Sequence, residues 1–171
     1  MENDGFIVIE GIHKNPNNID TIDDNVNSTL TMAQQATRTI DIISRKLDPA
    51  IYNTPEFIEA IKQLIIGSSR ARVRILVFEP SQIVKRGHRL VDLSMSMSSY
   101  ITINVPGKEH GSFNESLFIA DATAYVYRLQ SDRFEAKLNF NDKRASRFLI
   151  HEFDEMWGRS RSDPNLRRTI L

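Results

Sequence analysis

The sequence predicts a single α/β domain, in which helices flank a mixed and mostly parallel sheet. Residues 37–44, 71–79 and 100–105 carry alternating or continuous apolar residues, as strands do. Residues 53–69 instead place apolar side chains at helical spacing. Strands that alternate with helices usually pair in parallel through right-handed crossovers, and a hairpin near residue 120 makes the sheet mixed. The chain of 171 residues, 40% of them hydrophobic, suits one domain with a substantial core.

Residues 1–27 differ in composition from the rest and are predicted to form a flexible N-terminal arm before a domain at residues 28–171. Apart from an apolar run at residues 6–9, the arm is rich in Asn and Asp, and it buries too little apolar area to offset the entropy of ordering. The apolar run is expected to dock as a stray strand or to act as a peptide motif for a partner. Ser28 or Thr29 is expected to cap the first helix.

The clearest helical signal begins near residue 54. Asn53 or Thr54 is the expected cap, and Pro55 suits the first turn. Gly67 is expected to end this helix, because glycine commonly follows the last helical turn. The sequence therefore predicts both ends of this element.

Further helices are expected at residues 81–94 and 142–158. Gly87 lies inside the first of them, where it weakens the helix by about 1 kcal/mol relative to Ala and suggests a close approach of two backbones. Residues 131–140 alternate apolar and polar side chains, which predicts an edge strand.

Charge and composition exclude several classes of function. The 22 basic and 22 acidic residues cancel, so no strong net field draws the whole molecule to nucleic acid or to an anionic membrane. The absence of Cys excludes disulfides, thiolate metal sites and Cys nucleophiles. The four histidines lack metal-ligand spacing, and no Gly-rich phosphate loop follows a strand, so neither a metal nor a cofactor is expected. With no signal-like or membrane-spanning apolar run, we expect a cytoplasmic protein.

Residues 114–129 contain the most specific pattern in the chain. They read as a buried strand, a tight turn at residues 121–123 and a second strand. Asn114 and Ser116 lie two residues apart on the first strand, so their side chains point to the same face. Asp121 opens the turn, which is a common place for Asp because its side chain bonds the local backbone.

Together with the element order and a closing helix that ends in FDEMWGRS, this pattern resembles the phospholipase D-like superfamily over residues 36–160. Members carry H-x-K-x4-D, in which the His attacks phosphorus and the Lys neutralises phosphate oxygens. Asn114, Ser116 and Asp121 stand at these positions. Asn does not attack or titrate near neutral pH, and Ser carries no charge for phosphate, so the resemblance implies that catalysis is lost. The family's downstream Gly-Ser pair is also absent, with Arg128 near its place.

The phrases LDPAIYNTPEF, RARVRILVFEP and KRGHRL are similar to those of a bacterial group of uncharacterised phospholipase D-like domains with degenerate motifs. The resemblance implies a non-catalytic binding or scaffold domain. Its former catalytic cleft, around Asn114, Ser116 and Asp121, would hold a phosphate-containing or other polar ligand. A homodimer is also implied, because active single-domain members pair about a two-fold axis. An acetyltransferase-type partner follows from members that are joined to such a domain.

Two alternatives stay open. His110, in the loop before the strand, is the nearest group able to exchange protons near pH 7, so a divergent phosphodiesterase or phosphotransferase would use this displaced His. Arg72, Arg74 and Arg128 are candidate anion-binding residues, because the guanidinium fork matches phosphate oxygens; nucleic-acid binding is therefore the third interpretation. The plain structural account is a solvent-exposed loop His and solvated arginines.

Overall fold

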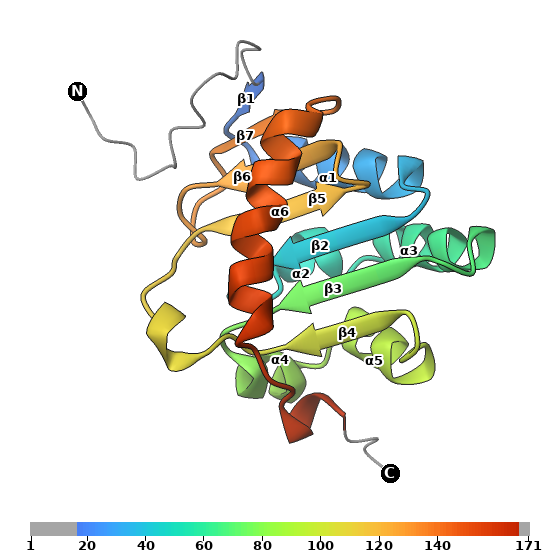
Figure 1. The fold of residues 1–171 in the computed structure, drawn as a ribbon, viewed down its shortest axis with the longest axis vertical. Helices are drawn as coiled ribbons and strands as arrows, with labels where there is room; N and C mark the ends of the chain where they lie inside the picture. The colour runs from blue at the N-terminus through green and yellow to red at the C-terminus, as the bar shows by residue number, and fades with distance from the viewer. Residues whose placement is uncertain (1–16, 168–171) are drawn as a thin grey trace.

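The computed structural model describes residues 17–167, so the strand expected at residues 6–9 lies outside the described residues. One seven-stranded sheet separates α6, on one face, from the other five helices (Figure 1). The elements in chain order are β1 (Asn17–Ile19), α1 (Ile22–Gln35), β2 (Thr39–Ile43), α2 (Pro49–Tyr52), α3 (Pro55–Gly67), β3 (Arg72–Leu76), α4 (Pro80–Arg86), α5 (Arg89–Ser96), β4 (Ile101–Asn104), η1 (Lys108–His110), β5 (Ser116–Ala120), β6 (Ala124–Arg128), β7 (Ala136–Asn139), α6 (Lys143–Gly158) and η2 (Pro164–Leu166).

The sheet has the strand order β1-β7-β6-β5-β2-β3-β4. The predicted parallel pairing of the first three predicted strands is confirmed, because β2 pairs with β3 and β3 with β4 in parallel. The mixed sheet is also confirmed. The expected excess of parallel pairs is wrong, because the other four pairings are antiparallel. The cause is that β5 enters the sheet antiparallel to β2, that the meander β5–β6–β7 turns back twice, and that β1 adds antiparallel to the outer side of β7.

Alternate residues of each strand supply two separate cores. Ile42 and Phe118 face α1 to α5 in the larger core, while Ile43 and Leu117 face α6 in the smaller one. In both, neighbouring residues point to opposite faces, as strand geometry requires. The central strands are therefore largely apolar on both faces, which explains the apolar runs at residues 75–78 and 117–120.

The ordered domain begins before the predicted boundary at residue 28. Residues 17–19 form β1, and α1 starts at Ile22 with the Thr21 side chain accepting from the backbone N–H of Asp24 (3.1 Å). Ser28 and Thr29 therefore lie inside this helix and do not cap it. The polar Asn25 is fully buried, and its side-chain amide donates to the carbonyl of Phe134. This distant partner compensates for the burial of a polar side chain in a segment of unpromising composition.

Two other expectations need correction. The helix predicted over residues 81–94 is split into α4 and α5 at Gly87, whose φ of 80° is typical of glycine. No atom lies within 4 Å of a Cβ built there, so backbone conformation and not close approach explains this glycine. The strand predicted within residues 131–140 is present as β7, but it is not an edge, because β1 pairs with its outer side.

The helices α3 and α6 start as predicted. The side chain of Thr54 accepts from the backbone N–H of Phe57 (3.1 Å) at the start of α3, and that of Asp142 accepts from Ala145 (3.0 Å) at the start of α6. Within residues 17–167, no helix combines the length and apolar character needed to cross a membrane.

Candidate functional site

The tight turn of the β5–β6 hairpin places Asp121 far from the other two motif positions. Asp121 and Ala122 have φ values of 55° and 51°, as the predicted turn requires. The Asp121 carboxylate accepts from the backbone N–H groups of Thr37 (2.8 Å), Arg38 (2.8 Å) and Thr39 (3.0 Å). It therefore fixes the entry to β2, at the opposite end of β5 from Asn114 and Ser116.

Asn114 lies beside a cavity of about 470 Å³ at the end of the sheet where β2 and β3 finish. The open sheets of α/β proteins commonly bind ligands at the carboxyl ends of their parallel strands. The cavity is lined by residues from four loops, namely Arg45, Lys46, Asp48, Glu79, Asn114, Ser131, Asp132 and Phe134.

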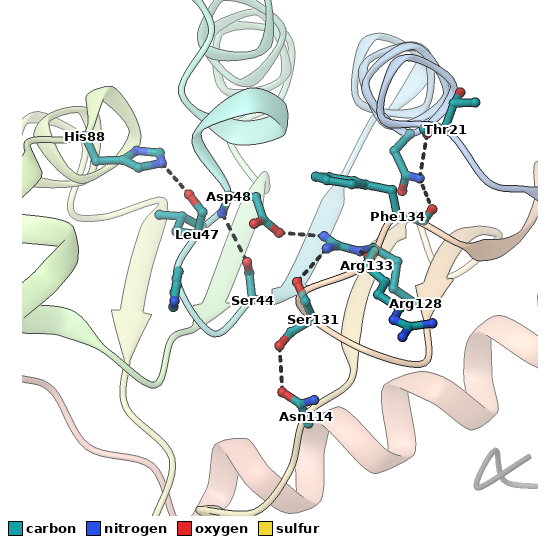
Figure 2. A network of polar contacts seen from close by, with 12 residues as sticks. Thr21, Ser44, Leu47, Asp48, His88, Asn114, Arg128, Ser131, Arg133 and Phe134 are labelled. Atoms are coloured by element: carbon teal, nitrogen blue, oxygen red, sulfur yellow. Dashed lines mark hydrogen bonds and ion pairs between the residues drawn. The ribbon is translucent and has the colours of Figure 1, made fainter.

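Arg128 organises the wall of this cavity (Figure 2). Its guanidinium donates to a carboxylate oxygen of Asp48 (2.5 Å) and to the backbone carbonyls of Ser131 (2.6 Å) and Arg133 (2.7 Å). It also lies over the ring of Phe134, 4.8 Å from the ring centre. These contacts tie the loop at residues 129–135 to the turn that follows β2.

Ser116 lies next to this arginine and faces away from solvent. It is directly opposite Arg128 in the β5–β6 pairing and only 3% exposed. Within the described residues its hydroxyl has no hydrogen-bond partner. The structure therefore puts Ser116 beside the cavity wall and not among the lining residues.

The turn after β2 is held from its other side by His88. Asp48 donates its backbone N–H to the Ser44 hydroxyl (3.3 Å), and the carbonyl of Leu47 accepts from the Nε2–H of His88 (2.9 Å). Nδ1 of His88 accepts from the backbone N–H of Leu90 (3.1 Å). Burial lowers the pKa of His88 to about 4. This histidine is therefore neutral at pH 7 with both nitrogens engaged, and it supports the site without taking part in acid–base chemistry.

Asn114 is oriented by the loop across the cavity. Ser131 donates its backbone N–H to the carbonyl of Asn114 (2.7 Å) and its hydroxyl to the side-chain oxygen of Asn114 (2.7 Å). The side-chain nitrogen is then the group with which Asn114 can bind a ligand, as a donor.

His110 and the three predicted anion-binding arginines do not converge on this cavity. His110 belongs to η1, outside the lining, with Nε2 3.9 Å from a carboxylate oxygen of Glu109. Arg72 is exposed at the start of β3. Arg74 is buried on the α6 face, where Nε and Nη1 bond Asp41 (2.7 Å) and Asp154 (2.8 Å). Of the three arginines, Arg128 alone adjoins the cavity.

Sequence reasoning missed most of the lining. Arg45, Lys46 and Asp48 follow the end of β2, and Glu79 follows β3. Polar residues just after two parallel strands are a signal that could have pointed to this edge of the sheet. The approach of Ser131 and Asp132 depends on Arg128, which no local pattern reveals.

The lining offers polar recognition without a nucleophile of the phospholipase D kind. It presents the cations Arg45 and Lys46, the acids Asp48, Glu79 and Asp132, and no histidine. Over residues 17–167, no group of three or more metal-ligating side chains is close enough to hold a metal ion. The arrangement can bind charged and hydroxyl groups, and it lacks the attacking imidazole of the motif.

Comparison with known families gives a clear result. A family model described as "Domain of unknown function (DUF7931)" matches residues 21–169. The chain belongs to this family. The match also begins before residue 28, in agreement with the ordered α1 of this DUF7931 domain. No curated protein matches the chain.

Solved structures show the same fold at low sequence identity. TrmBL2, an archaeal chromatin protein described as showing a novel mode of DNA binding, matches with a TM-score of 0.65 and 13% identity over 92% of this chain. This DUF7931 domain spans 56% of TrmBL2. NucT from Helicobacter pylori matches with a TM-score of 0.59 and 14% identity, and the match covers 86% of this chain and 99% of NucT. Nuc from Salmonella typhimurium, a phospholipase D family member, matches with a TM-score of 0.52 and 15% identity. This match covers 79% of this chain and 88% of Nuc. The fold is therefore phospholipase D-like.

Proposed function

We propose that this DUF7931 domain is a non-catalytic phospholipase D-like binding domain, whose cavity beside Asn114 holds a polar ligand with a phosphate group. One observation carries the proposal: the cavity wall has Asn114 where the motif would place its nucleophile, and no histidine lines it. The neighbouring cation, Arg128, is already neutralised by Asp48. Chemistry on phosphorus would therefore lack its nucleophile, and Arg128 is not free to neutralise phosphate oxygens.

Binding of a phosphate group is supported by Lys46 and Asn114. Lys46 is exposed at the cavity and forms no ion pair with any residue from 17 to 167. The Asn114 side-chain nitrogen adds a neutral donor. Glu79 and Asp132 would repel a second anionic group, so a ligand with an amine or hydroxyls beside its phosphate fits the lining better than a polyphosphate.

An NMR titration of the ¹⁵N-labelled domain with O-phosphoethanolamine tests this proposal. We expect saturable shifts at residues 45–48, 114 and 131. Lys46→Ala should weaken binding about tenfold or more, because it removes a charge-assisted hydrogen bond. Lys62→Ala, an exposed lysine on α3, is the matched control and should leave the affinity unchanged. Shifts that do not saturate, or equal loss in both variants, would overturn the proposal.

The same samples separate this proposal from other functions of phospholipase D-like proteins. A homodimer, inherited from active single-domain members, would double the mass measured by light scattering. Nucleic-acid binding would appear as an affinity for DNA that falls steeply with salt. Tight DNA binding without phosphoethanolamine binding would favour that function over a small-ligand cavity.

A further inference from the structure

The sheet ends at β4 in an edge that is open along part of its length. β4 pairs with β3 alone, and the N–H of Val77 donates to the carbonyl of Asn104 (3.0 Å). Backbone groups of successive strand residues point to alternate sides. Since Asn104 faces β3, Ile103 and Ile101 direct their backbone groups to the outer side, where the N–H of Ile101 already donates to the carbonyl of Met97 (3.0 Å).

An antiparallel neighbour begins on that outer side and then stops. Val105 and Arg161 exchange two backbone hydrogen bonds, of 2.7 and 3.0 Å. The chain next turns away into η2, which Asp163 caps by accepting from the N–H of Asn165 (2.8 Å). Among the described residues, Ile103 is therefore left with no backbone partner on the outer side. One residue pair has set the register for a strand that the chain itself does not continue.

A groove of about 340 Å³ runs beside this open edge. Ile101, Ile103 and Leu166 give it apolar walls. Arg167 is the single charged residue of the lining, and Arg161 is exposed close by at the bridge with Val105. The groove therefore combines the free N–H and carbonyl of Ile103, an apolar wall and a positive rim.

We propose that the open edge of β4 binds an extended acidic peptide segment of a partner protein, which adds as an antiparallel strand in register with the Val105–Arg161 pair. Strand addition uses main-chain hydrogen bonds for affinity and takes alternate side chains into pockets. Here the backbone groups of Ile103 supply the main-chain hydrogen bonds, and the groove supplies the pockets for side chains. The positive rim selects acidic side chains on the outer face of the peptide. Nucleic acid would use the arginines but could not complete the backbone ladder.

Hydrogen exchange of individual amides tests this proposal directly. The probe is a capped peptide of alternating glutamate and valine, seven residues long. Saturating peptide should slow exchange of the Ile103 amide at least about tenfold, because the amide gains a protein partner. The Val77 amide, already bonded to Asn104, should keep its rate.

Two altered peptides and one variant identify the binding mode. Methylating one of the two alternate sets of peptide nitrogens should abolish binding, because those N–H groups form the ladder. Replacing glutamate by lysine should also abolish it. Arg161→Ala with Arg167→Ala should weaken binding about threefold or more at low salt, whereas the exposed Arg70→Ala is the control without effect.

Several results would overturn the proposal. The first is an exchange rate of the Ile103 amide that millimolar peptide does not change. The second is binding that survives methylation of each of the two nitrogen sets in turn, and the third is equal binding of the lysine peptide. DNA binding that depends on Arg161 and Arg167 while the peptide has no effect would assign the edge to nucleic acid. Protection of Ile103 that appears with protein concentration alone would assign it to a second copy of the chain.

Discussion

The two faces of the sheet each bury one arginine, and the two arginines connect different parts of the structure. On one face, Arg74 lies in an α6 cluster, which we define as Asp41, Arg74, Phe153, Asp154 and Trp157. On the other, Arg128 lies in a pocket cluster, which we define as Ser44, Asp48, Asn114, Arg128 and Ser131. The first attaches a helix to strands, whereas the second attaches loops to one another around a cavity.

The difference lies in the partners. The guanidinium of Arg74 bonds two carboxylates and lies 4.6 Å from the ring centre of Phe153. Arg128 bonds one carboxylate and two backbone carbonyls. A charge bonded to side chains of a helix and a strand stabilises the whole fold, while one bonded to loop carbonyls fixes a local shape. We therefore assign Arg74 to stability and Arg128 to the geometry of the site.

The largest expected effect comes from Arg74→Met. It leaves the buried Asp41 without its partner, which typically costs about 3–5 kcal/mol of unfolding free energy. Urea denaturation at pH 7 measures this cost. Adding Asp41→Leu should recover most of it, because the uncompensated charge is then gone. Equal stability of the single and double variants would contradict the explanation through an uncompensated charge, and an unchanged stability of Arg74→Met would contradict the assignment of Arg74 to stability.

Acid should also affect this variant in a specific direction. Burial raises the pKa of Asp41 above its ordinary value, although the bond from Arg74 opposes the shift. A carboxyl with a raised pKa in the folded state costs more stability as pH rises through that pKa. The deficit of Arg74→Met should therefore shrink as the pH is lowered from 7 toward 4.

His88, next to the pocket cluster, should make the stability of the domain respond to acid in the opposite direction. Its pKa of about 4 lies below the ordinary 6.5, so between these values the unfolded chain binds a proton that the folded chain does not. Stability is then fully present above pH 6.5 and falls by about 3 kcal/mol as the pH drops to 4. His88→Asn should flatten this slope in pH-dependent urea melts. His151→Asn, at an exposed position of α6, should keep it.

A smaller loss of unfolding free energy is expected from Arg128→Lys. A lysine keeps the charge but cannot bond Asp48, Ser131 and Arg133 together, which should cost about 1–3 kcal/mol. It should also speed hydrogen exchange of the Ser131 amide, because the loop loses its anchor. Arg133→Lys is the control, since that side chain is exposed in the same loop. Unchanged exchange at Ser131 would show that the loop does not depend on Arg128.

The smallest effects compare two buried serines of the pocket side. Ser44→Ala removes an acceptor for the Asp48 N–H and should cost about 1 kcal/mol. Ser116→Ala removes a buried hydroxyl that has no partner among residues 17–167, so it should change stability by less than about 0.5 kcal/mol or raise it. Thermal unfolding of both proteins checks this order. A larger loss for Ser116→Ala would show that its hydroxyl has a role.

Local sequence signals predicted the elements whose causes are local. The cap Thr54 and the turn at residues 121–123 both follow from residues within three positions along the chain. The start of α1 was missed although its cap, Thr21 to Asp24, is local, because the Asn- and Asp-rich composition predicted a flexible arm there. The burial of Asn25 depends on Phe134, 109 residues away. The edge position predicted for β7 was wrong because β1, from a segment without a strand pattern, covers it.

The same contrast between local and distant causes applies to the candidate site, where Asn114 was predicted and most other lining residues were not. Spacing along one strand predicted Asn114 and Ser116 on one face. In the structure β5 begins at Ser116, and Asn114, in the loop before it, lines the cavity whereas Ser116 does not. The Arg128–Asp48 pair joins residues 80 positions apart. Composition and periodicity carry no information about such a pair, so the wall opposite Asn114 could be found only from the folded chain.

The central claim is that the cavity binds without catalysing phosphodiester cleavage. Its most direct test is the release of nitrophenolate from bis(4-nitrophenyl) phosphate by the purified domain over a full day. The account predicts a rate equal to that of buffer, for the domain and for its Asn114→Ala variant alike. Release above buffer that Asn114→Ala or His110→Ala abolishes would contradict it.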